Sequence, residues 1–171
     1  MKRKPKYLID DLPPDILAGI GLIIAWWGYL QLQLGVIIRE AAKLEVETGF
    51  ALTIGPDVVD LCKMIQSLAG TDHWIKDPVL RADMEKLRKD VLNKSSHRNE
   101  YAHGTFGYSG EDPKRYVRHL FSTPAQRIQP GEEPMTPESL TLISDEARAL
   151  WQRAQDITHR LKALPGKRGR P

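Results

Sequence analysis

The chain has little of what several kinds of functional site require. Cys62 is the single cysteine among 171 residues, which excludes an intramolecular disulfide and a zinc site built from several cysteines. No group of residues has the spacing of metal ligands, and we expect neither a metal nor another cofactor. Cys62 lies in the amphipathic stretch VVDLCKMI, where a small buried side chain is a more economical explanation than a nucleophile.

Charge is absent from a long segment near the N-terminus. No charged residue lies between Asp15 and Arg39, and the run 16–38 is long enough to cross a bilayer. Two glutamines interrupt this run, so its purely apolar part is limited to 16–30. No small-residue cleavage site stands out. We expect a buried helix of a soluble, cytoplasmic protein, with a membrane-anchored protein as the alternative.

Two stripes of different size run along this segment. The bulky stripe has the spacing of a bundle helix and comprises Ile16, Ile20, Ile23, Trp27, Leu30, Leu34 and Ile37. The second stripe consists mostly of small residues and comprises Ala18, Gly21, Ala25, Gly28, Leu32 and Gly35. The pattern predicts a helix packed on two sides, whose small side permits close approach of another helix, such as one from a second subunit.

Positive charge is concentrated at the two ends of the chain. The formal net charge is +3, but residues 1–6 carry four cations and residues 165–171 carry three, which leaves −4 between them. We expect a basic N-terminal tail over 1–12 and a basic C-terminal tail over 165–171. Such tails attract a polyanion through counterion release, or they serve only solubility.

Hydrophobic periodicity predicts an all-α class with one domain over 13–164. Prolines, glycines and polar caps delimit four long helices. They are expected over about 13–46, 53–69, 78–104 and 144–164. A break is expected at Thr48-Gly49.

An irregular insert, 105–143, separates the third helix from the last. It is rich in glycine and proline. Residues 115–122 alternate enough for a short strand, and 139–144 is the expected partner in a small hairpin. A loop crossing is the alternative.

The end of the third predicted helix carries the sequence HRNEYAHG, residues 97–104. Successive helical residues differ by about 100°, so Arg98 and His103 lie about 140° apart, whereas Asn99 and His103 share a face. Arg98 and His103 therefore form a loose pair within one chain. A two-fold dimer can bring two copies of the motif to one groove.

This residue set suits cleavage of RNA without a metal. The ribose 2′-OH attacks its own phosphorus, a histidine takes or gives the proton, and an arginine holds the phosphate oxygens. Asn99 can orient His103 or hold the phosphate. The alternative is structural, because cations at a helix C-terminus complement its dipole, and Lys94, His97 and Arg98 are all placed to do so.

The sequence RNEYAH resembles the Arg-x4-6-His signature of the HEPN superfamily, in its Arg-Asn-x-x-Ala-His form. The resemblance covers about 15–104 and 144–164, and leaves the insert unmatched. It implies an up-and-down four-helix bundle that commonly dimerises. Many family members are metal-independent endoribonucleases with sites composed of both subunits, frequent in toxin–antitoxin, anti-phage and RNA-processing systems. The residues that carry over are Arg98, His103 and Asn99.

Further cations near the motif are candidates for contacts with the RNA backbone. They are Lys94, His97, Lys114, Arg115 and Arg118. The last three belong to KRYVRH, which interleaves cations with an aromatic residue. An exposed strand would have the same sequence.

The sequence therefore predicts a homodimeric, metal-independent endoribonuclease of HEPN type. The alternative is a non-catalytic helical module that binds nucleic acid or a protein partner such as an antitoxin.

Overall fold

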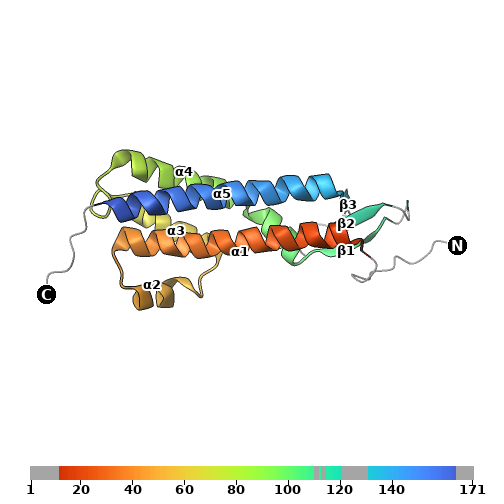
Figure 1. The fold of residues 1–171 in the computed structure, drawn as a ribbon, viewed down its shortest axis with the longest axis horizontal. Coiled ribbons are helices and arrows are strands. Elements are labelled where there is room, and N and C mark those ends of the chain that lie inside the picture. Colours follow the sequence, from red (N-terminus) through yellow and green to blue (C-terminus); the bar gives the residue numbers. More distant parts are fainter. Residues whose placement is uncertain (1–11, 110–111, 113–114, 121–130, 165–171) are drawn as a thin grey trace. The chain divides into compact units, whose positions relative to one another are not determined.

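The protein is largely helical, with one small sheet. The computed structural model describes residues 12–109, 112, 115–120 and 131–164, and both predicted tails lie outside this part (Figure 1). Within it the helices are α1 (Pro14–Ala42), α2 (Val46–Thr53), α3 (Val58–Ala69), α4 (Pro78–Ala102) and α5 (Pro137–Ala163). The strands are β1 (Thr105–Tyr108), β2 (Tyr116–Leu120) and β3 (Gly131–Pro134).

The chain divides into two compact units. The sheet unit comprises Met1–Ala25 and His97–Asp145, and the helical unit comprises Trp26–Ser96 and Glu146–Pro171. The helices α1, α4 and α5 each contribute one segment to each unit.

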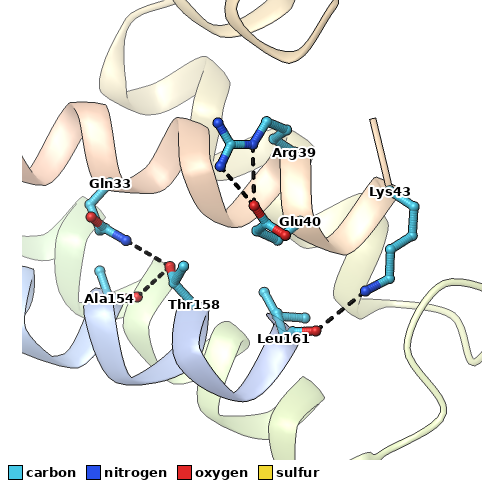
Figure 2. A network of polar contacts seen from close by, with 7 residues as sticks. All are labelled: Gln33, Arg39, Glu40, Lys43, Ala154, Thr158 and Leu161. Carbon is cyan, nitrogen blue, oxygen red and sulfur yellow. Dashed lines mark hydrogen bonds and ion pairs between the residues drawn. The ribbon is translucent and has the colours of Figure 1, made fainter. Parts of the chain in front are cut away.

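Four helices supply the apolar core of the helical unit. The buried side chains come from α1, α3, α4 and α5, and include Leu30, Leu34, Ile37, Leu61, Ile65, Leu80, Met84, Leu87, Leu150, Ile157 and Leu161. The predicted bulky stripe of the first helix is confirmed, because every one of its members is buried. Hydrogen bonds link the helices at the surface of this core; Gln33 of α1, for example, donates to Thr158 of α5 at 2.7 Å (Figure 2).

The first helix ends earlier than predicted. Lys43 has φ 54°, a left-handed conformation that stops α1, and the Leu44 amide donates to the Arg39 carbonyl at 3.0 Å. The break predicted at Thr48-Gly49 is wrong, because both residues lie within α2. Nothing in the composition marks Lys43, since the left-handed position usually takes glycine or asparagine.

The small stripe of α1 has two different environments. Gly35 is buried, and a Cβ there would lie 2.9 Å from the Thr53 hydroxyl of α2. At Gly21 and Gly28, both exposed, an added Cβ would meet no atom within 4 Å. One part of the predicted second face therefore packs on α2, while the rest is open to a further partner.

Aspartates start two of the helices. Asp57 accepts a hydrogen bond from the Asp60 amide at 2.9 Å and so caps α3, which places Pro56 before the helix rather than in its first turn. Asp77 accepts from the amides of Val79 and Leu80 and caps α4, as the Asp77-Pro78 pair predicted.

The sheet is antiparallel, in the order β1-β2-β3. The predicted strand over 115–122 is confirmed as β2, but its predicted partner is wrong, because 139–144 is helical. Phe106 of β1 and Glu133 of β3 lie opposite Arg118 of β2.

The last helix begins at Pro137 rather than at Ser144. Thr136 and Ser139 each accept a hydrogen bond from the other's amide, and proline occupies the first helical position. Leu140 is buried while Leu142 is 69% exposed. The alternation in SLTLIS was therefore a coincidence of helical spacing.

By length and composition, α1 is the single described helix able to cross a membrane. Of its most apolar 18-residue stretch, 33% is buried within the protein. The helix lies close to the N-terminus, where soluble core helices and signal sequences pass the same test.

Cys62 is expected to react slowly with thiol reagents while the protein is folded. Its side chain is fully buried in α3, as predicted, and burial raises the pKa of its thiol to about 11. This lowers the thiolate fraction at about pH 8 by about 100-fold. Because the unfolded thiol ionises first, stability should also fall between about pH 9 and about pH 11. Thiol labelling with and without denaturant measures the first effect, and rapid labelling of the folded chain would contradict it. Chemical unfolding across that pH range measures the second, with Cys62→Ala as the control that lacks this slope.

Candidate functional site

The predicted motif lies at the C-terminal end of α4, in the sheet unit. Arg98 is half-buried, whereas Asn99 and His103 are exposed. The Arg98 guanidinium donates to the Asn99 side-chain oxygen at 3.0 Å, and the His103 amide donates to the Asn99 carbonyl at 3.0 Å. The final helical bond thus sets the backbone at His103, and its imidazole makes no polar contact within the described residues.

The intervening residues of the motif hold this helix end on the sheet. Tyr101 is buried, and its ring stacks on Phe106 of β1 with centroids 6.3 Å apart. Glu100 accepts a hydrogen bond from the Arg118 guanidinium of β2 at 2.7 Å. The motif therefore has an anchoring side, Glu100 and Tyr101, and a solvent side that carries Asn99 and His103.

Arg118 is the centre of the anchoring contacts. Its side chain is 5% exposed, and it forms ion pairs with Glu100 and with Glu133 of β3. Its guanidinium lies 4.8 Å from the centroid of the Tyr101 ring, within the range of a cation–π contact. Burial opposes its charge, but the two carboxylates outweigh that effect and raise the pKa of Arg118. Burial raises the pKa of Tyr101 as well.

Gly104→Ala is expected to destabilise the sheet unit by about 1–3 kcal/mol and to displace His103. A Cβ at position 104 would lie 2.3 Å from the Glu100 carbonyl oxygen and 3.0 Å from Phe106. The backbone atom cannot move without unwinding the end of α4. Thermal unfolding measures the effect. Gly55→Ala is the control, because a Cβ there meets no atom within 4 Å, and equal melting temperatures for the two variants would contradict this account.

The structure does not bring Arg98 and His103 together within one chain. No hydrogen bond or other contact joins these side chains in the described residues, in agreement with their predicted 140° separation. Asn99 is the member of the motif that contacts both, through its side-chain oxygen and its carbonyl. A site that uses both side chains therefore needs rearrangement or a second copy.

The other predicted RNA contacts have dissimilar environments. Lys94 lies in the helical unit and pairs with Glu146 at 2.7 Å. His97 is half-buried, Arg115 is exposed and Lys114 lies outside the described residues. The buried, doubly paired Arg118 is an anchor of the motif and is unsuited to contact a phosphate.

Arg115 borders a cavity of about 400 Å³ in the sheet unit. The lining is mostly apolar or proline, and it also includes the Asp15 carboxylate. A negatively charged ligand in this cavity would therefore meet a negative as well as a positive side chain. Among the described residues, no group of three or more histidine, cysteine, aspartate or glutamate side chains is arranged to hold a metal ion.

Sequence reasoning missed the role of Glu100 and its partners. The cross-strand pair of Arg118 with Glu133 depends on the register of β2 with β3, and a loop separates the two strands. The available signal was a charged residue next to Val117 in a strand otherwise typical of burial.

A comparison of the chain with protein-family models, with curated proteins and with solved structures finds no match.

Proposed function

We propose that the protein is a metal-independent endoribonuclease of HEPN type, which cleaves RNA at a site formed by two subunits. The observation that carries the proposal is the division of labour within the motif. Glu100 and Tyr101 fix the end of α4 against the sheet, and Asn99 and His103 face solvent beside Arg98. A rigidly held helix end with an unengaged imidazole is what a proton-transfer site requires.

The proposed reaction is an internal transesterification. The 2′-OH of a ribose loses its proton to one His103 imidazole and attacks the adjacent phosphorus. The bond to the 5′-oxygen breaks, and that oxygen takes a proton from His103 of the partner subunit. The Arg98 guanidinium holds the phosphate oxygens as negative charge accumulates on them. The products are a 2′,3′-cyclic phosphate and a 5′-hydroxyl.

A homodimer supplies what one chain lacks. Arg98 and His103 do not meet within a chain, whereas a two-fold axis near the end of α4 would bring each motif to its counterpart. The open glycines of α1 support close packing by a second helix. The four longest helices, α1, α3, α4 and α5, are the proposed counterparts of the four bundle helices of the family, with the sheet as an insertion. The proposed location is the cytoplasm.

The test is cleavage of single-stranded RNA in excess EDTA, with analysis of the product ends. The proposal expects cleavage that leaves 2′,3′-cyclic phosphates and persists in the chelator. Cleavage that stops in EDTA, or that leaves 3′-hydroxyl ends, would overturn it. RNA binding without cleavage would support the non-catalytic binding module instead, with a protein partner such as an antitoxin to be sought.

A further inference from the structure

Three aromatic side chains gather at the surface of the helical unit. Trp26 and Tyr29 come from α1, and Trp151 comes from α5. The Trp26 ring lies 5.2 Å from Trp151 and 5.8 Å from Tyr29, and Tyr29 lies 6.5 Å from Trp151, between centroids. Each pair is tilted, so that no ring covers another face to face.

These rings are outside the core. Tyr29 is 56% exposed, and Trp26 and Trp151 are half-buried. The two tryptophans contribute to the packing of α1 on α5. Tyr29 extends the same surface into solvent, where helix packing gains little from it.

A cation borders the aromatic cluster. The Arg148 guanidinium lies 5.6 Å from the centroid of the Trp26 ring. Arg148 is exposed and has no carboxylate partner among the described residues, whereas Arg153 and Arg160 of the same helix pair with Asp90 and Asp83. Its charge is therefore available to an anion beside the rings.

The seam between α1 and α5 continues from the cluster with little negative charge. Figure 2 shows Gln33 bonded to Thr158, and Lys43 donating to the Leu161 carbonyl at 3.3 Å. The carboxylate in this network belongs to Glu40 and is paired with Arg39 at 2.7 Å. A polyanion that follows the seam would meet cations and amides, with the one carboxylate of the network already neutralised.

We infer that Trp26, Tyr29, Trp151 and Arg148 form a stacking site for unpaired bases of single-stranded RNA. Bases stack on aromatic side chains whatever their identity, and a neighbouring guanidinium binds the backbone phosphate. The inference rests on the proposed function for the identity of the polymer. It adds a site in the helical unit that holds the strand independently of the motif at Arg98 and His103.

Tyr29 provides the sharpest test, because it is exposed enough to be removed without unfolding the protein. The probe is a fluorescein-labelled single-stranded oligoadenylate, titrated into the full chain carrying His103→Ala to prevent cleavage. Tyr29→Ala should weaken binding about 5- to 150-fold, the usual loss for one stacked base. Tyr29→Phe keeps the ring and should bind as the parent does.

Two further variants separate stacking from other effects. Arg148→Ala should weaken binding and lower its dependence on salt. Trp74→Ala is the matched control, because Trp74 is 47% exposed and lies outside the cluster, and its loss should change nothing. Duplex RNA, whose bases are already stacked, should not distinguish Tyr29→Ala from its parent.

Equal affinity of the alanine, phenylalanine and parent chains for oligoadenylate would overturn the inference. So would a loss of self-association, or of binding to phospholipid vesicles, as the only effect of Tyr29→Ala. Stacking and catalysis can fail separately. Tyr29-dependent binding without cleavage by the wild-type chain removes the proposed function alone, and cleavage with Tyr29-independent binding removes the stacking site alone.

Discussion

His103→Ala should lower the rate of RNA cleavage about 100- to 10,000-fold, the usual contribution of a positioned general acid or base. The imidazole is exposed at the end of α4 and makes no polar contact within the described residues. Its removal should leave the melting temperature almost unchanged, so that the loss reports on chemistry rather than folding. Single-turnover cleavage of a labelled RNA in EDTA is the measurement.

His159→Ala is the matched control for this substitution. His159 is an exposed histidine of α5, in the helical unit and outside the motif. Its variant should cleave at the wild-type rate. Equal rates for His103→Ala and His159→Ala would remove His103 from the mechanism.

Arg118→Ala should destabilise the protein by about 2–3 kcal/mol and lower cleavage at temperatures near its melting point. The substitution removes the guanidinium that joins Glu100 to Glu133 and covers Tyr101. Breaking a fully buried ion pair costs about 3–5 kcal/mol. The smaller figure applies here because both carboxylates are more than a third exposed and regain water.

Arg115→Ala separates this effect from the general loss of an arginine. Arg115 is exposed, just before β2 begins, and its removal should change stability by less than about 0.5 kcal/mol. Chemical denaturation of both variants provides the comparison. A fully stable Arg118→Ala chain would show that the end of α4 is held by the Tyr101–Phe106 contact alone.

The elements that followed from the sequence are those set by burial or by strong caps. The stripe from Ile16 to Ile37 faces the core because nothing else on α1 is both bulky and regularly spaced. The end of α4 before Gly104 and the position of β2 were likewise predictable. The orientation of the motif followed from helical geometry, since Arg98 and His103 do not meet in either account.

The elements that escaped prediction depend on contacts between distant residues. The end of α1 rests on a left-handed lysine, Lys43, a residue without special preference for that conformation. The start of α5 rests on the reciprocal bonds of Thr136 and Ser139. The aromatic cluster joins Tyr29 to Trp151 across most of the chain, and only the packing of α1 on α5 brings them together.

Mixing wild-type and His103→Ala subunits tests the composite site most directly. Equal amounts are unfolded together, refolded so that subunits pair at random, and assayed for cleavage in EDTA. A site that needs His103 from both subunits predicts about one quarter of the wild-type activity, because only that fraction of random dimers carries two imidazoles. About one half of the wild-type activity would show that each chain cleaves alone, and would contradict the account.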